Sequence, residues 1–138
     1  MSERALLLDT CALIWIANNE QIGAQAFEAV RAAENDGFIY VCPFSAWEIG
    51  TLVARGRLRL TMSAEAWFER IVAPPAVRMA SLTSTILTRS TSLPGTPPAD
   101  PAGRIILSTA RELGVPVMTR DRRILDYAAE GWVRALPC

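Results

Sequence analysis

The sequence predicts an α/β protein built on a mostly parallel β-sheet. Short apolar runs of strand length alternate along the chain with segments whose apolar residues recur at helical spacing. Two of these runs, at 6–8 and 115–119, are each closely followed by an aspartate and a helical segment, as in a βα unit. At 138 residues the chain fits a single domain, 1–138, whose core needs no disulfide or metal to hold it.

In the first part of the chain, helical spacing and polar breaks define the elements. Asn18 and Asn19 close the first helical pattern, and the polar stretch 34–37 is a turn into the second strand. Ser45 is expected to begin the third helix, which stops near Gly56. The expected elements are a strand at 6–8, helices at 10–18 and 23–33, a strand at 38–41 and a helix at 45–56.

In the second part, helix-capping residues are the main signals. Ser63 is a favourable N-cap, and Asp100 with Pro101 supplies a cap and a first helical residue. Gly114 is expected to end that helix. The expected elements are a helix from 63 to Pro74, a strand at 77–82, a helix at 84–90, a loop at 93–99, a helix from 101 to Gly114, a strand at 115–119, a helix after Asp121 and an edge strand at 132–136.

Composition excludes several kinds of chemistry. The chain contains no histidine, which removes Ser-His-Asp catalysis and histidine-ligated zinc, and all 14 basic residues are arginine. The lack of lysine argues against a Walker-type phosphate loop. The three cysteines lack CxxC spacing, so neither a disulfide framework nor a zinc site is indicated. No apolar run could span a bilayer, and residues 1–4 do not resemble a signal peptide, so we expect a cytoplasmic protein.

The remaining candidates for chemistry are carboxylates. Asp9 and Asp121 follow strands whose carboxyl ends share one edge of a parallel sheet, and Glu48 and Asp100 lie near helix starts that reach the same edge. Each has a structural alternative, because aspartate is a good N-cap and Ser45 with Glu48 fits a capping box. Clustered carboxylates repel unless they are protonated or a cation compensates them, and oxygen ligands suit Mg²⁺ or Mn²⁺. Such ions activate water for phosphodiester hydrolysis.

Several segments, in order and with matching spacing, resemble those of the PIN-domain ribonucleases, and in particular the VapC toxins of type II toxin–antitoxin pairs. These segments are spread over nearly the whole chain and are Leu7-Leu8-Asp9-Thr10-Cys11-Ala12-Leu13, Ser45-Ala46-Trp47-Glu48-Ile49, and Asp100-Pro101-Ala102-Gly103-Arg104-Ile105-Ile106 running through to Thr119-Arg120-Asp121-Arg122-Arg123. The resemblance implies a three-layer α/β/α sandwich and a toxin that cleaves RNA as an endoribonuclease dependent on Mg²⁺ or Mn²⁺. It also implies a homodimer and a small VapB-like antitoxin, a segment of which occupies the active-site groove.

The resemblance also implies roles for individual residues. The catalytic, metal-binding carboxylates would be those of Asp9, Glu48 and Asp121, with Asp100 as the fourth. Supporting hydroxyl groups would come from Thr10, Ser45 and Thr119. Arg104 and Arg120 are further candidates to bind substrate phosphate, and Arg104 could equally pair with Asp100 or Glu112.

One position departs from the family pattern. Family members commonly carry a second aspartate where this chain has Gly103, three residues after Asp100. Three alternatives follow: Asp100 takes over directly or through water, the site binds one metal ion more weakly, or the chain is an impaired nuclease that mainly binds an antitoxin or RNA. A HAD-type phosphatase is disfavoured, because its nucleophile motif needs a second aspartate where this chain has Cys11.

Overall fold

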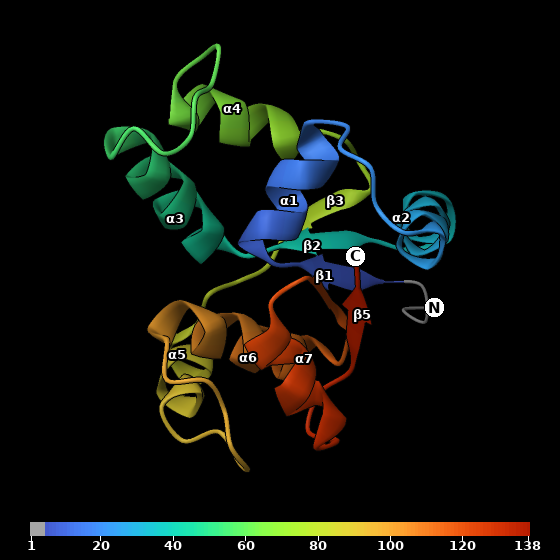
Figure 1. Ribbon diagram of the computed structural model, residues 1–138, viewed down its shortest axis with the longest axis vertical. Coiled ribbons are helices and arrows are strands. Elements are labelled where there is room, and N and C mark those ends of the chain that lie inside the picture. Colours follow the sequence, from blue (N-terminus) through green and yellow to red (C-terminus); the bar gives the residue numbers. More distant parts are fainter. Residues whose placement is uncertain (1–4) are drawn as a thin grey trace.

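A parallel β-sheet lies at the centre of the structure, with helices on both faces (Figure 1). The computed structural model describes residues 5–138, so the prediction about a signal peptide at residues 1–4 falls outside the described residues. The strands are β1 (Leu6–Leu8), β2 (Ile39–Val41), β3 (Val77–Met79), β4 (Val117–Thr119) and β5 (Ala135–Pro137). The helices are α1 (Thr10–Ala17), α2 (Ala24–Asp36), α3 (Pro43–Ala54), α4 (Ala64–Ile71), α5 (Ser84–Ser90), α6 (Pro101–Leu113) and α7 (Arg122–Ala129).

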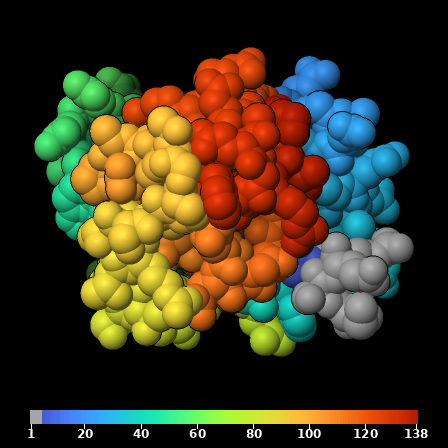
Figure 2. Space-filling model, turned by 90° about the horizontal axis from the view of Figure 1, so that it is seen from below, coloured from blue at the N-terminus to red at the C-terminus, as the bar shows by residue number. Residues whose placement is uncertain are grey.

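The three layers follow from strands that are apolar on both faces. In β1, Leu6 and Leu8 pack with α1 to α4 on one side, whereas Leu7 packs with α6 and α7 on the other. Successive side chains of a strand point to opposite faces, so three consecutive leucines bury β1 completely. Figure 2 shows the outer layer that α5, α6 and α7 form over their face. The predicted α/β/α sandwich is confirmed.

The strand order creates a switch point beside β1. The sheet runs β3-β2-β1-β4-β5 with all four pairings parallel, so the chain builds outward on one side of β1 and then on the other. In the register between β1 and β4, Leu8 lies opposite Met118, and the Asp9 amide donates to the Met118 carbonyl at 3.1 Å. Ligands of open α/β sheets bind at the carboxyl ends of the strands beside such a switch point.

Helix capping agrees with most of the predicted boundaries. Ser63 and Asp100 are N-caps, and Gly114 ends α6 in the left-handed conformation that favours glycine. The predicted start of α3 at Ser45 is wrong, because Pro43 occupies its first turn and Cys42 is the N-cap residue. The capping-box alternative for Glu48 therefore does not hold, since Ser45 is buried within the helix.

The last three strands are shorter than predicted. β3 ends at Met79, and β4 begins at Val117 rather than at 115. The closing strand begins at Ala135 instead of 132, because Gly131, with φ 96°, makes a turn that separates Trp132 from the sheet. Among the described residues, no helix has both the length and the apolar character that crossing a membrane requires.

Candidate active site

The four predicted carboxylates lie around one pocket at the carboxyl ends of the strands. Asp9, Glu48, Asp100 and Asp121 all line it, together with Gly103. They come from the end of β1, from α3, from the start of α6 and from the residues after β4. We call this hollow the acidic pocket. The four carboxylates are grouped because the carboxyl ends of all strands in a parallel sheet share one edge.

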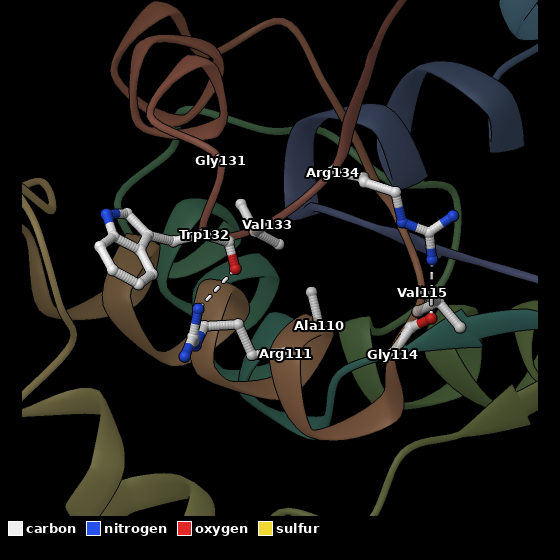
Figure 3. Close-up of a pocket in the computed structure, with 8 residues that line it drawn as sticks. All are labelled: Ala110, Arg111, Gly114, Val115, Gly131, Trp132, Val133 and Arg134. Atoms are coloured by element: carbon white, nitrogen blue, oxygen red, sulfur yellow. Dashed lines mark hydrogen bonds between the residues drawn. The ribbon is translucent and has the colours of Figure 1, made fainter.

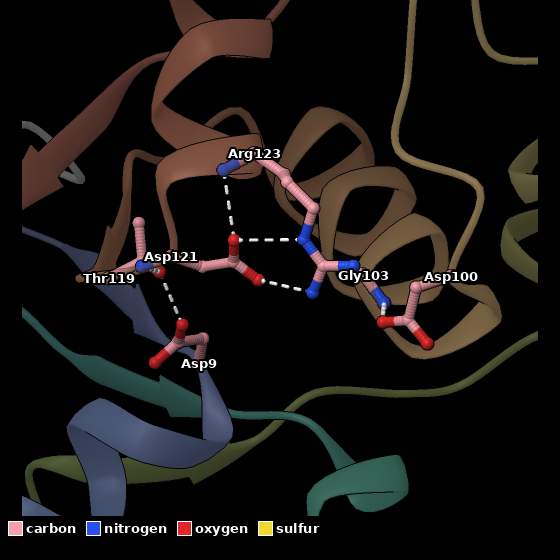
Figure 4. Close-up of polar contacts among 6 residues, drawn as sticks. All are labelled: Asp9, Asp100, Gly103, Thr119, Asp121 and Arg123. Carbon is pink, nitrogen blue, oxygen red and sulfur yellow. Dashed lines mark hydrogen bonds and ion pairs between the residues drawn. The ribbon is translucent and has the colours of Figure 1, made fainter.

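Asp9 is both a helix cap and a lining residue of the acidic pocket. Its Oδ1 accepts a hydrogen bond from the Ala12 amide at 2.8 Å, and its Oδ2 accepts one from the Thr119 hydroxyl (Figure 4). Burial raises the pKa of the Asp9 carboxyl, the two hydrogen bonds oppose that change, and the nearby Asp121 carboxylate adds to it. The two interpretations of Asp9 are therefore compatible.

Glu48 is held by a chain of hydroxyl groups. Its Oε1 accepts a hydrogen bond from the Thr10 hydroxyl at 2.5 Å, and Thr10 Oγ1 lies 2.8 Å from the Ser45 hydroxyl. Because the single proton of Thr10 goes to Glu48, Ser45 donates to Thr10. Burial raises the pKa of the Glu48 carboxyl, and the negative charges of Asp100 and Asp9 contribute in the same direction. The carboxylates of the acidic pocket thus act on one another.

Asp121 caps α7 and pairs with an arginine of the same helix. Its Oδ1 accepts from the Arg123 amide at 2.9 Å and from Arg123 Nε at 3.2 Å, and its Oδ2 accepts from Arg123 Nη2 at 3.0 Å (Figure 4). The hydrogen bonds from Arg123 lower the pKa of the Asp121 carboxyl. Thr119 links Asp121 to Asp9, because its hydroxyl accepts from the Asp121 amide while it donates to Asp9.

Arg123 is a pocket residue that the sequence did not single out. Its side chain lines the acidic pocket although it is 61% exposed. The available signal was its position, two residues after the acid that follows β4. An N-cap carboxylate is within reach of a long side chain in the first helical turn.

Asp100 and Gly103 lie together in the first turn of α6. Asp100 Oδ2 accepts from the Gly103 amide at 2.9 Å, as an N-cap does. A Cβ atom placed on Gly103 would lie 3.4 Å from Asp100 Oδ2 and 3.4 Å from Pro98 Cγ, which is ordinary contact. The structure therefore accommodates a Cβ atom at Gly103.

The two predicted phosphate-binding arginines lie outside the lining of the acidic pocket. Arg104 Nε donates to the Pro98 carbonyl at 2.7 Å, and the guanidinium of Arg120 lies 3.9 Å from the centre of the Trp15 ring. Arg120 also donates to the Gln21 carbonyl at 3.0 Å. Both remain predictions for RNA contacts beside the acidic pocket.

The donor chemistry of the acidic pocket fits a hard divalent cation. Its polar lining is mainly carboxylate and hydroxyl oxygen, which Mg²⁺ and Mn²⁺ prefer. The pKa values of Asp9 and Glu48 are raised mainly by burial, with smaller contributions from the neighbouring carboxylates. Within residues 5–138, however, no three acidic or cysteine side chains stand close enough to share an ion. Shared binding of one ion by three of these carboxylates would therefore require them to move closer together.

A second hollow, at the amino ends of β4 and β5, has different chemistry. Arg111 donates to the Trp132 carbonyl, and Arg134 donates to the Gly114 carbonyl at 2.8 Å (Figure 3). None of the eight residues that line it is acidic. The carboxylates that could serve hydrolysis are thus at the opposite edge of the sheet.

This chain belongs to the PIN domain family, whose sequence model matches residues 6–130. Over 123 residues it is 29% identical to ribonuclease VapC22 of Mycobacterium tuberculosis (strain ATCC 25618 / H37Rv). The matched region covers 88% of this chain and 91% of the relative.

Two solved structures show the same fold. One is VapBC2 from Rickettsia felis bound to a DNA fragment from their promoter, with a TM-score of 0.67, 9% identity and coverage of 96% of this chain and 98% of that one. The other is FitAcB from Neisseria gonorrhoeae, with a TM-score of 0.56, 18% identity and coverage of 95% and 96%.

Proposed function

We propose that this protein is a divalent-metal-dependent endoribonuclease and the toxin of a toxin–antitoxin pair. The observation that carries this proposal is the placement of Asp9, Glu48, Asp100 and Asp121 around one pocket at the switch point of a PIN-type sheet. Similarity to ribonuclease VapC22 over most of both chains supports it. We propose further that residues 1–138 form one domain.

In this proposal the carboxylates of Asp9, Glu48, Asp100 and Asp121 would hold Mg²⁺ or Mn²⁺. The bound ion would supply activated water and neutralise charge on the phosphate. Hydroxyl groups fix the carboxylates: Thr119 orients Asp9, and Ser45 orients Thr10 toward Glu48. Arg104 and Arg120, which lie beside the acidic pocket, would bind phosphates of the RNA strand.

Metal dependence provides the direct test of this function. The purified chain should cleave RNA internally in Mn²⁺ or Mg²⁺, and excess chelator should return cleavage to the background rate, because hydrolysis relies on a bound cation. Cleavage is measured on labelled RNA by gel electrophoresis. Cleavage that persists in the chelator would contradict metal dependence.

The alternative is an impaired PIN module that mainly binds an antitoxin or RNA. Two observations favour this alternative. Gly103 contributes no carboxylate, and Asp121 is already paired with Arg123. A chain that does not cleave RNA in either metal ion, but still binds its partner, would establish it.

A surface between α3 and α4 supports a protein partner such as an antitoxin. The hollow there is lined by Ala46, Trp47 and Phe68, and Glu65 and Glu69 add negative charge. The Trp47 side chain is 62% exposed and stacks on Phe44, with ring centroids 5.4 Å apart. Glu48 is the next residue on α3, so an antitoxin segment with apolar and basic side chains could cover this surface and enter the acidic pocket.

Trp47→Ala should weaken binding of the antitoxin by about tenfold or more, because exposed aromatic anchors carry much of the energy of an interface. The partner to measure is the product of a small reading frame beside the gene, using calorimetry with the purified chain. Trp132→Ala, which removes another exposed tryptophan remote from α3, is the matched control. Equal affinity of the two variants for the antitoxin would show that the surface between α3 and α4 does not bind it.

A homodimer is proposed as well. Phe27 on α2 is 53% exposed beside a hollow lined by Ile16, Ile22 and Val30, which suits contact with a second copy. Light scattering coupled to size exclusion measures the mass of the free chain, and a monomeric mass would refute the dimer.

A further inference from the structure

Arg123 places a positive charge inside a pocket that otherwise gathers carboxylates. Its guanidinium contacts Asp121 through two nitrogens, Nε and Nη2, in a forked geometry that matches both carboxylate oxygens. The interaction raises the pKa of the Arg123 side chain, with a smaller contribution from the charge of Asp100. Arg123 thus lies within electrostatic reach of two of the four carboxylates.

Both carboxylate oxygens of Asp121, through which it would bind a cation, already accept hydrogen bonds from Arg123. Asp121 Oδ1 already accepts the capping bond from the Arg123 amide, and Oδ2 receives the Nη2 contact. A divalent ion at this carboxylate would meet both an occupied oxygen and a like charge. The Arg123 side chain is 61% exposed and that of Asp121 is 30% exposed, so solvent screens the ion pair and it is weak enough to be displaced.

We propose that Arg123 is the resident counter-ion of Asp121, and that a divalent cation has to displace its guanidinium to bind in the acidic pocket. This inference rests on the proposed metal dependence. Displacement costs part of the binding energy of the ion, so Arg123 sets the metal affinity of the site below that of the carboxylates alone. The freed guanidinium stays at the edge of the pocket, where the phosphate of a bound RNA would replace Asp121 as its partner.

The test compares Mn²⁺ binding to the wild type, Arg123→Gln and Arg122→Gln by calorimetry on the full chain. Arg123→Gln should bind Mn²⁺ about three- to tenfold more tightly, because the competing ion pair and the like charge are both removed. Arg122→Gln removes an equal charge from the neighbouring exposed residue, which does not line the acidic pocket, and should match the wild type. The capping bond of Asp121 comes from a backbone amide, so the glutamine variant keeps the cap of α7.

A second measurement follows the guanidinium itself. In nitrogen-edited NMR spectra, the Nε–H signal that is missing from Arg123→Gln identifies Arg123. It should shift as Mg²⁺ is added, with the same concentration dependence as Mg²⁺ binding measured by calorimetry on the same chain.

The possible outcomes separate this proposal from the function on which it rests. Equal Mn²⁺ affinity of Arg123→Gln and the wild type, or an Nε–H signal that does not respond to Mg²⁺, would overturn the competition and leave the metal-dependent nuclease standing. An absence of Mn²⁺ binding in all three chains would overturn both.

Discussion

Asp9→Asn should lower the rate of metal-dependent RNA cleavage by about 100-fold or more. Asparagine keeps the shape of the side chain and an oxygen for the Ala12 amide, but it removes the negative charge that Asp9 contributes to the lining of the acidic pocket. Loss of a carboxylate that binds an essential ion removes several kcal/mol of transition-state stabilisation. The rate is measured at saturating Mn²⁺ on labelled RNA.

The same variant should be more stable than the wild type at neutral pH. Burial raises the pKa of Asp9 in the folded chain above its value in the unfolded chain, so the wild type loses stability as the pH rises through that interval. Asparagine does not titrate, and its advantage should therefore grow from acid to neutral pH. A gain of about 1 kcal/mol would raise the melting temperature by about 3 to 5 °C for a chain of this size.

This combination separates chemistry from folding. Asp126→Asn removes an exposed carboxylate that does not line the acidic pocket, and it should leave the cleavage rate unchanged. Wild-type cleavage rates in Asp9→Asn would refute the metal-binding role of Asp9. A lower melting temperature of Asp9→Asn than of the wild type at neutral pH would refute the claim that burial of the Asp9 charge is unfavourable.

Gly103→Asp should raise the affinity of the chain for Mn²⁺ by about tenfold, because it adds a carboxylate to the acidic pocket. The new Cβ meets only ordinary contacts, and a negative charge in the first turn of α6 is favourable to the helix. Its carboxylate would also lie near that of Asp100, and this repulsion makes the variant more dependent on a cation. Thermal melting with and without Mn²⁺, together with calorimetry, measures both effects.

Gly103→Ala is the matched control. It adds the Cβ atom and removes the extra backbone freedom of glycine, as the aspartate does, but it adds no charge. The cleavage rates of the wild type and the two variants distinguish the three alternatives for this position. Activity only in Gly103→Asp identifies the wild type as an impaired nuclease. A rise from a measurable rate identifies a site with weak metal binding, and an unchanged rate indicates that Asp100 already serves as the fourth carboxylate.

The sheet and the grouping of acids could be predicted from sequence because both follow from strand order. Asp9 and Asp121 come after strands that are apolar on both faces, and parallel strands place their following residues at one edge. The catalytic and metal-binding roles of these residues remain predictions.

The details that could not be predicted depend on competition between local signals. Both Pro43 and Ser45 are favourable residues for the start of a helix. In the structure α3 begins at Pro43, whose backbone angle is fixed, and the buried Ser45 hydroxyl hydrogen-bonds to Thr10. The ion pair between Arg123 and Asp121 depends on a long side chain folding back over a helix cap. Neither the pattern of apolar residues nor residue type determines that conformation.

The pairing of β1 with β4 also has a consequence for the timing of synthesis. Asp9 and Thr119 are hydrogen-bonded partners that lie 110 positions apart in the chain. During translation, Asp9 leaves the ribosome long before Thr119, Asp121 and Arg123 have been made, and β1 has no β4 neighbour until then. A chain that ends before β4 therefore lacks the part of the acidic pocket that Asp121, Arg123 and Ile124 contribute. Under the proposed function, RNA cleavage therefore has to wait until β4 and the residues after it have been made.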